Sequence, residues 1–445
     1  MNAAIARKVF FGFIFVRQLW LLATEEGRKF IISGGPGVAC DDGLMPSDVI
    51  IAGGGPAGLS AAATLAGQGC SVLVLEQNHE IGSPIRTSGG TFIDEMQALG
   101  IPERLYHPVS RVRFVSPNNS ATFDYAVPRL GILDVRGTFR FLAERAISAG
   151  AQVRLSTRVT ELILGDGFAR GVKVQDREMR CKLVIDATGY RSTLLKQSGL
   201  DPGFRRFGVG SEYDLYAPHC NQDEAVLIVG SQIAPSGYAW VCPWGRGKVR
   251  VGVGVIHPDS RDNPEDYLDK LVSEAARFGV NLKGAQPVEH HTGLIPSERF
   301  VDKFAGNGIL GIGDAVGNAS SLVGEGIRWA IYAGRMAGEV AAPALAKSDV
   351  SRRALEPFER GWRKKFGTDL SLAHGINERI ARWDDQKWDS RTEFLKLLSP
   401  DQFAEAMKTN LRGRWLWKFA ATHAAQLAEV AGGWASARVG LQPRS

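Results

Sequence analysis

Short apolar runs separated by glycine-rich turns set the pattern of the first part of the chain. Residues 48–52 and 71–75 are rich in β-branched apolar side chains, and a glycine-rich turn at 53–58 and an Ala- and Leu-rich segment at 59–68 lie between them. A continuous apolar run is typical of a strand buried on both faces of a parallel sheet. Strand, turn, helix and strand within about 30 residues predict the βαβ unit of a nucleotide-binding fold.

The same kind of pattern returns later in the chain. Residues 153–155, 183–186 and 308–312 are short apolar runs that predict further strands, the last two of them buried. An amphipathic pattern at 138–149, ended by glycine, predicts a helix, and a second helix is predicted from about 326 to 345.

Two regions alternate polar and apolar residues instead. Residues 111–126 and 207–255 show this alternation, which predicts antiparallel strands of a second sheet with turns at Pro235-Ser-Gly and Gly245-Arg-Gly. Beyond residue 345 the sequence is helical in pattern and rich in tryptophan.

The order of these patterns predicts an α/β protein. We expect a discontinuous Rossmann-like nucleotide-binding domain, an inserted antiparallel-sheet domain for substrate and a C-terminal helical region. The expected boundaries are an N-terminal extension at 1–45, nucleotide-binding segments at 46–110, 131–205 and 301–345, sheet segments at 111–130 and 206–300, and the helical region at 346–445.

The net charge of +6 is carried by the C-terminal region. From Ala346 onward the chain has 18 Lys and Arg against 12 Asp and Glu. Such a region could contact an anionic membrane surface, or it could be a solvated helical surface with mixed charges. We expect no nucleic-acid partner, and a peripheral membrane contact stays open.

The five cysteines form no C-x-x-C pair, so neither zinc nor an iron–sulfur cluster is predicted. An odd, scattered set of cysteines also argues against a disulfide framework and for a reducing, cytoplasmic location.

Near the N-terminus, an apolar run at 9–23 contains Arg17 and is shorter than the ~20 residues that span a bilayer. We interpret this run as an extension or interfacial anchor, with the folded protein starting near Met45.

Gly53-Gly-Gly-Pro-Ala-Gly58 is a G-x-G-x-x-G motif between a predicted strand and a predicted helix. Gly53 would permit the tight turn, Gly55 the close approach of a pyrophosphate, and Gly58 the packing of helix on strand. The helix N-terminus offers unpaired N–H groups to the phosphates. Glu76 closes the next strand 18 residues after Gly58, where an acceptor for ribose hydroxyls is expected.

A second glycine-rich segment indicates FAD rather than NAD. Gly311-Ile-Gly-Asp314-Ala-Val-Gly317 ends the last predicted strand, and Gly324-Glu-Gly-Ile327 opens the next helix. Asp314 could accept hydrogen bonds from ribityl hydroxyls. Backbone N–H groups near Gly326 could stabilise negative charge on the reduced flavin ring.

These motifs, together with Ile185-Asp-Ala-Thr-Gly189, resemble the flavoprotein superfamily of p-hydroxybenzoate hydroxylase type, which includes aromatic hydroxylases and geranylgeranyl reductases. Two segments resemble the reductases, namely Glu80-Ile-Gly-Ser-Pro-Ile-Arg-Thr-Ser-Gly-Gly90 and Pro235-Ser-Gly-Tyr238-Ala-Trp240-Val-Cys-Pro243. Besides Gly53, Gly55 and Gly58 of the glycine motif, the resemblance implies FAD contacts at Ala57, Glu76, Arg136, Val159, Asp314, Gly326 and Ile327, with Thr87, Ser88 and Gly90 lining the flavin.

Tyr238, Trp240 and Thr87 are the candidates for catalytic or pocket-lining residues. Tyr238 and Trp240 lie two apart in a predicted strand, so both rings should face one side and line an apolar pocket. Where the family's loop usually carries Cys this chain has Thr87, and Cys242 replaces the signature's Phe. The proton donor is left open between Tyr238 and a water near Thr87. His290 and His291 should point to opposite faces, and no metal site is predicted.

The resemblance implies an FAD-dependent oxidoreductase that hydrogenates C=C bonds of an isoprenoid chain on a lipid or diphosphate. The electron donor, NAD(P)H or a ferredoxin-like redox partner protein, is undetermined because no second nucleotide motif is complete. One rival is a flavin monooxygenase or halogenase of the same fold. Another, from a different class, is a non-catalytic flavin-binding adaptor at a membrane.

Overall fold

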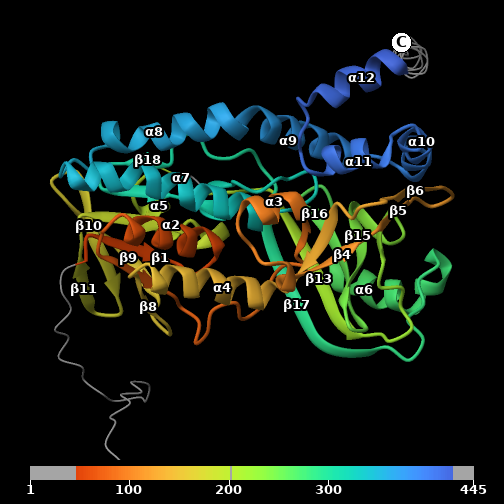
Figure 1. Cartoon of the computed structure of the whole chain (residues 1–445), viewed down its shortest axis with the longest axis horizontal. Helices are drawn as coiled ribbons and strands as arrows, with labels where there is room; N and C mark the ends of the chain where they lie inside the picture. The colour runs from red at the N-terminus through yellow and green to blue at the C-terminus, as the bar shows by residue number, and fades with distance from the viewer. Residues whose placement is uncertain (1–46, 201–202, 424–445) are drawn as a thin grey trace, which may run out of the picture. The chain divides into compact units, whose positions relative to one another are not determined.

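The computed structural model describes residues 47–200 and 203–423. The predicted N-terminal extension and the last 22 residues, 424–445, therefore lie outside the described part of the chain. Mixed sheets and helices confirm the predicted α/β class (Figure 1).

A six-stranded sheet with the order β18-β19-β12-β1-β2-β8 forms the half that is predicted to bind a nucleotide. All its neighbouring pairs are parallel except β18 with β19. Its strands are β1 (Val49–Ala52), β2 (Val72–Leu75), β8 (Gln152–Arg154), β12 (Leu183–Asp186), β18 (Ala305–Gly306) and β19 (Ile309–Gly311). Every strand that the apolar runs predicted is therefore present, to within one or two residues.

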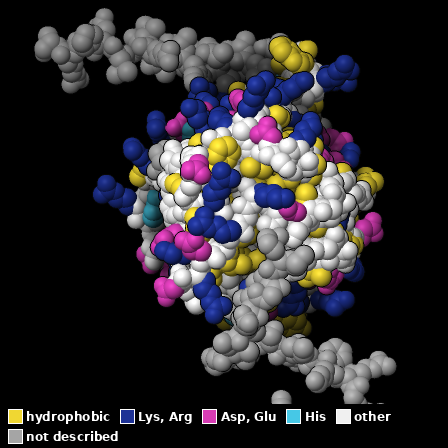
Figure 2. Space-filling view, turned by 90° about the vertical axis from the view of Figure 1, so that its left-hand side faces the viewer, with side chains coloured by type: hydrophobic (Ala, Val, Ile, Leu, Met, Phe, Trp, Pro, Cys, Tyr) yellow, Lys and Arg dark blue, Asp and Glu magenta, His cyan; other side chains and the backbone are white. Residues whose placement is uncertain are grey.

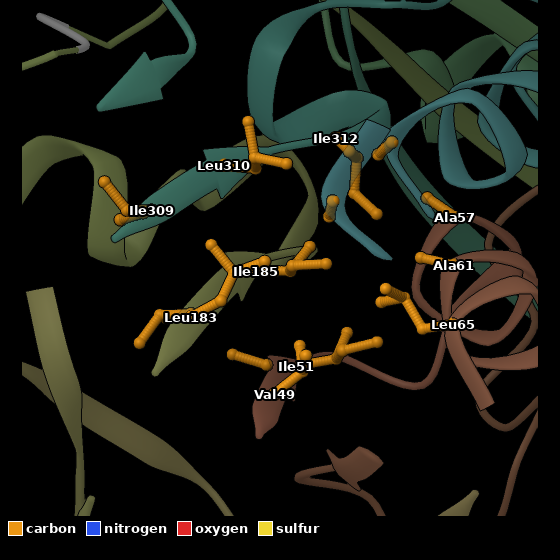
Figure 3. Packing of buried hydrophobic residues seen from close by; sticks show 14 of the residues in the cluster. Val49, Ile51, Ala57, Ala61, Leu65, Leu183, Ile185, Ile309, Leu310 and Ile312 are labelled. Atoms are coloured by element: carbon orange, nitrogen blue, oxygen red, sulfur yellow. The ribbon is translucent and has the colours of Figure 1, made fainter. Parts of the chain in front are cut away.

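Helix α2 (Pro56–Gly67) packs on this sheet, and helix α7 (Ile327–Ala346) packs against α2. Figure 3 shows Ala57, Ala61 and Leu65 of α2 directed toward the apolar side chains of β1, β12 and β19. A Cβ at Gly334 of α7 would lie 2.2 Å from the carbonyl oxygen of Ala57, so glycine there sets the short distance between the two helices. This contact places the N-termini of both helices at the same edge of the sheet.

A seven-stranded sheet with the order β17-β13-β16-β15-β14-β5-β6 forms the second half. Its strands are β5 (Arg111–Val115), β6 (Ser120–Asp124), β13 (Phe207–Tyr216), β14 (Glu224–Gly230), β15 (Ala234–Gly245), β16 (Lys248–His257) and β17 (Gln286–Pro296). All neighbouring pairs are antiparallel except β14 with β5. The predicted second sheet is thus confirmed.

One predicted turn in this sheet is wrong. Pro235, Ser236 and Gly237 belong to strand β15, and the turn before them is at residues 231–233. A Cβ at Gly237 would lie 1.9 Å from the carbonyl oxygen of Gly254 on the neighbouring strand. The glycine that suggested a turn therefore allows two strands to approach closely. The predicted turn at Gly245-Arg-Gly is confirmed.

Smaller elements complete the two halves. Helix α4 (Val135–Ser148) confirms the predicted amphipathic helix, with Asp134 accepting from the N–H of Gly137 at its N-terminus. The other strands and α-helices in this part of the chain are the sheet β11-β10-β9 (Arg177–Arg180, Phe168–Val174, Val159–Gly165), the sheet β3-β7-β4 (Gly90–Phe92, Leu130–Leu133, Tyr106–Val109), and helices α3 (Ile93–Ala98), α5 (Thr193–Gln197) and α6 (Pro264–Ser273).

The C-terminal region is helical, as predicted. It comprises α8 (Arg352–Trp362), α9 (Thr368–Ile380), α10 (Asp385–Leu395), α11 (Pro400–Met407) and α12 (Arg414–Thr422), drawn in blue in Figure 1. Trp362 is fully buried against Trp329 and Phe366 and packs helices together. Trp362 therefore has no surface to offer a membrane interface, whereas Trp417 is 78% exposed.

Figure 2 shows one face of the molecule, with Lys and Arg side chains interspersed among Asp and Glu and single hydrophobic side chains. Within the described residues, no helix has the length and hydropathy required to cross a bilayer.

Candidate active site

A cavity of about 940 Å³ lies where the two halves and the C-terminal helices meet. The turns that follow β1, β12 and β19 line it, so it opens at the carboxyl ends of the parallel strands, where such folds bind their ligands. The predicted residues that line it are Gly55, Ala57, Thr87, Ser88, Tyr238, Trp240, Asp314, Gly326 and Ile327. The predicted residues outside its lining are Gly53, Gly58, Glu76, Gly90, Arg136 and Val159.

The first glycine-rich turn has the geometry that its motif implies. Gly53 has φ +114°, and a Cβ there would lie 2.2 Å from the carbonyl oxygen of Ala187. A Cβ at Gly58 would lie 2.1 Å from the carbonyl oxygen of Gly53. A Cβ at Gly55 would meet nothing within 4 Å, and no side chain caps the N-terminus of α2 there. The turn thus leaves free backbone N–H groups beside an open space, which fits a pyrophosphate.

Glu76 supports this turn from the end of β2. One carboxylate oxygen accepts from the N–H of Gly54 at 2.7 Å, and the other accepts from the backbone and side-chain nitrogens of Asn78. A carboxylate has about four acceptor positions, so Glu76 retains capacity for a ribose hydroxyl.

The other three predicted contacts outside the lining occupy different settings. Arg136 in the first turn of α4 pairs with Glu289 of β17 at 3.2 Å. Val159 is buried at the start of β9, and Gly90 begins β3. Their roles toward FAD stay predictions.

The Asp-Ala-Thr-Gly segment forms the turn after β12. Asp186 is fully buried, and its side chain accepts from the backbone N–H groups of Thr188, Leu194 and Leu195. Burial raises the pKa of Asp186, against the effect of these hydrogen bonds. The turn it stabilises continues into residues 187–191, which line the cavity.

Asp314 faces the cavity from the turn after β19. Within the described residues its carboxylate has no hydrogen-bond partner, and burial raises its pKa to about 6. The carboxylate lies close to Gly326, the N-terminal cap of α7, where a Cβ would be 3.5 Å from its oxygen. No side chain caps α7, so an unpaired acceptor and free N–H donors lie side by side. This donor and acceptor set fits ribityl hydroxyls and the polar edge of a flavin ring.

Tyr238 and Trp240 line the cavity from β15. Their ring centroids are 5.6 Å apart and both line the cavity, which confirms that they share one face of the sheet. The phenol O–H of Tyr238 donates to the carbonyl oxygen of Val323 at 2.5 Å, and the indole N–H of Trp240 donates to Glu212 at 2.6 Å. Each aromatic ring is thus held by one hydrogen bond.

Beside this aromatic pair, a row of glycines hollows the sheet. Tyr238, Gly254, Gly210 and Gly293 lie in register across β15, β16, β13 and β17. A Cβ at Gly293 would lie 2.4 Å from the carbonyl oxygen of Arg86, so the loop that contains Thr87 and Ser88 runs directly over this row. Glycine therefore brings the predicted flavin loop against the sheet.

On the same face of the sheet, sequence reasoning missed Glu212, Glu289 and Arg250, and it considered His291 only as a metal ligand. Glu212, His291 and Glu289 form a hydrogen-bonded chain, and fully buried Arg250 donates to the carbonyl oxygens of Ser88 and Leu133 at 2.7 and 2.9 Å. In the sequence, these residues could have been noticed only as charged residues at alternate positions of otherwise apolar strands. A buried charge in such a strand requires a partner, but the partner's strand cannot be read from the sequence.

The arm of the cavity beside α10 and α11 is mostly apolar, although Asn377, Arg379 and Arg391 of α9 and α10 also line the cavity. It is lined mainly by residues of α10, α11 and the strands facing them, namely Phe114, Leu227, Val229, Trp383, Trp388, Phe394, Leu395, Leu398, Phe403, Ala406 and Met407. A mostly apolar cavity with a few polar groups at one end is typical of a small-molecule or cofactor site.

The fold and the site together define a flavoprotein oxidoreductase with a Rossmann-like FAD domain. A model of the FAD binding domain family matches residues 46–338. The digeranylgeranylglycerophospholipid reductase of Methanosarcina acetivorans is 31% identical over 365 residues, which cover 78% of this chain and 88% of that protein. Reductase 2 of Methanothermobacter thermautotrophicus is 31% identical over 363 residues, which cover 79% and 92%.

A crystal structure of a geranylgeranyl bacteriochlorophyll reductase-like protein from Thermoplasma acidophilum has the same fold, with a TM-score of 0.76, 24% identity, and coverage of 85% of this chain and 99% of that one. The chain belongs to the FAD binding domain family and, within it, to the family of the digeranylgeranylglycerophospholipid reductases. It is an FAD-dependent oxidoreductase.

Proposed function

We propose that the enzyme hydrogenates C=C bonds of an isoprenoid chain carried on a lipid or a diphosphate. The observation that carries the proposal is the cavity, which joins the two glycine-rich turns to an apolar arm lined by aromatic and aliphatic side chains. Burial of an alkyl chain contributes about 0.8 kcal/mol per CH₂, so such an arm can hold a long chain without polar contacts. The names of the relatives point to the same class of substrate.

FAD, when bound and reduced, supplies the hydride. The residues of this chain must then orient an alkene that has no polar handle. Tyr238 and Trp240 offer flat aromatic walls, and their negative faces stabilise positive charge that develops on an alkene carbon. The apolar arm excludes water, which strengthens each of these interactions.

The test is anaerobic mixing of the reduced enzyme with a geranylgeranyl lipid, with product identified by mass spectrometry. We expect saturated product and reoxidised flavin. Ala406→Phe, which adds a ring to the arm, should lower turnover of a long chain more than that of a short one. Flavin that stays reduced beside unchanged substrate would contradict the proposal. Substrate-stimulated oxygen uptake with an oxygenated or halogenated product would favour a monooxygenase or halogenase.

The proposal extends to a peripheral membrane contact through α12. Leu416 and Trp417 are 41% and 78% exposed, and the basic Arg414 and Lys418 belong to the same helix. Phe419 of α12 packs against Phe394, which lines the cavity, with ring centroids 5.7 Å apart. A lipid substrate could therefore pass from a membrane to the apolar arm beside α12.

A further inference from the structure

A row of residues runs from the cavity wall to the edge of the seven-stranded sheet. Trp240 of β15, Gly252 of β16, Glu212 of β13 and His291 of β17 lie in register on one face. Glu289 lies two residues before His291 on the edge strand and therefore points to the same side.

Hydrogen bonds join the four side chains of this row, those of Trp240, Glu212, His291 and Glu289, into one continuous chain. Glu212 accepts from Trp240 with one carboxylate oxygen, and its other oxygen lies 3.3 Å from Nδ1 of His291. Nε2 of the same imidazole lies 2.8 Å from a carboxylate oxygen of Glu289. Both ring nitrogens of His291 thus face carboxylates, an arrangement that suits the doubly protonated imidazolium.

Exposure to solvent increases along the row. The side chains of Glu212 and His291 are 5% and 6% exposed, and both line the cavity, whereas Glu289 is 35% exposed at the sheet edge. The neighbouring His290 points away from the row, with its Nε2 2.8 Å from the hydroxyl of Ser211. The row therefore connects bulk water to the cavity through a single buried histidine.

The charges around His291 favour its protonated form. Burial alone would lower the pKa of His291, but the hydrogen bonds and charges of Glu212 and Glu289 outweigh burial and raise it above its ordinary value. The same hydrogen bond to His291 lowers the pKa of Glu289. The other titratable or charged groups on the packed elements are Asp214 of β13, Arg250 of β16, Tyr238 and Cys242 of β15, and Arg136 of α4.

We propose that Glu212, His291 and Glu289 form the proton relay of the reductase, with Glu212 as the acid that faces the substrate. The inference rests on the proposed function. Hydrogenation adds two electrons and one proton, as hydride from reduced FAD, to one alkene carbon, and a second proton to the other. The C=C π bond breaks, two C–H bonds form, and FAD is left oxidised. In the resting site His291 holds this proton between two carboxylates; its Nδ1 passes the proton to Glu212, which delivers it to the alkene carbon. Water then reprotonates His291 at Nε2, with Glu289 passing on the proton.

The alternative proton sources along the wall are less suitable. The O–H of Tyr238 is committed to the carbonyl oxygen of Val323, and burial raises its pKa well above the ordinary value. Cys242 packs in a small apolar cluster outside the cavity lining, and burial raises its pKa to about 12. Glu212 and His291, in contrast, both line the cavity, and Glu289 connects them to water.

The first test needs no turnover. Histidine NMR titration of the protein with oxidised FAD bound should show His291, assigned with the variant His291→Gln, protonated to a pH well above its ordinary pKa of about 6.5. Glu212→Gln and Glu289→Gln should each lower this pKa, while His290→Gln should leave it unchanged. An ordinary pKa for His291 that neither carboxylate influences would overturn the relay.

The second test follows the reaction. Glu212→Gln keeps an acceptor for the indole of Trp240 and should keep FAD bound, as judged from the visible flavin absorbance. Because general acid catalysis contributes about 10²- to 10⁴-fold, the rate of flavin reoxidation by substrate should fall by at least about a hundredfold. Wild-type reoxidation should slow at high pH, as His291 loses its proton, and this dependence should disappear in His291→Gln.

The two proposals fail in different ways. Wild-type enzyme that reduces no isoprenoid would contradict the proposed function, whereas the NMR titration would still decide whether the coupled triad exists. Wild-type turnover that Glu212→Gln and His291→Gln both retain would overturn the relay alone. If Glu212→Gln fails to fold, His291→Gln provides the same comparison, with His290→Gln as its matched control.

Discussion

The indole N–H of Trp240 donates to Glu212 at 2.6 Å, although a whole strand, β16, lies between their strands. The ring spans this distance by passing over Gly252, where a Cβ would come within 2.3 Å of an indole carbon. One glycine in the sheet therefore determines both where the aromatic wall of the cavity lies and which carboxylate it contacts.

Gly252→Ala should displace this indole. Inserting a methyl group into a packed position typically costs about 1–3 kcal/mol, so we expect a loss of this size in the free energy of unfolding. Adding Trp240→Phe should recover part of it, giving non-additive changes in a double-mutant cycle. Denaturant unfolding measures both effects. Gly210→Ala is the control, because its Cβ would meet the nearest atom at 3.7 Å. Equal stability of the Gly252→Ala variant and the parent would refute the overlap.

Arg250→Met should weaken both the fold and FAD binding. The variant leaves buried Asp214, 3.5 Å from the guanidinium, without its counter-charge, and breaking such a pair costs about 3–5 kcal/mol. It also releases the carbonyl oxygen of Ser88 in the flavin loop. We expect FAD titrations to show a lower affinity for Arg250→Met than for the parent protein. The affinity of Arg250→Lys should lie between these two values. Adding Asp214→Asn should restore part of the stability, and the assignment is wrong if it restores none.

Local patterns predicted the strands and turns at the end of the cavity where we expect the nucleotide. The G-x-G-x-x-G turn works through backbone geometry that three glycines encode within six residues, so Gly53, Gly55 and Gly58 could be assigned without tertiary information. The predicted spacing of Tyr238 and Trp240 is likewise a property of a single strand.

The polar network depends on strand register, which no local pattern encodes. Glu212 and His291 lie 79 residues apart in the chain and meet only because β13 pairs with β17 in one register. From the sequence alone, the adjacent His290 and His291 could therefore be considered only as metal ligands. The same reason explains the error at Gly237, since the strand that approaches it is contributed by a distant segment.

Asp314→Asn should have opposite effects on stability and on FAD affinity. Burial raises the pKa of Asp314 from 3.8 to about 6, so the folded protein without FAD loses stability as the pH rises from about 4 through 6. At pH 7 the loss amounts to at most about 3 kcal/mol, which the asparagine variant regains. FAD binding should weaken by about tenfold, because a charged acceptor is replaced by a neutral one. Unfolding curves at pH 4 and 7 and FAD titration measure these effects; a variant less stable than the parent at pH 7 would contradict them.

Trp417→Ala should weaken binding to vesicles of anionic phospholipid. The indole of Trp417 is 78% exposed on α12, and basic side chains on the same helix would contact the lipid headgroups. Burying a large apolar side chain contributes about 1.5–3 kcal/mol, so removing it should lower the vesicle affinity by at least about tenfold. Vesicle sedimentation measures this change. Trp415→Ala is the matched control, because the indole of Trp415 donates to the carbonyl oxygen of Asn410 within the protein. Equal binding by parent and Trp417→Ala would show that α12 is a solvated helix, and that lipid substrates reach the cavity by another route.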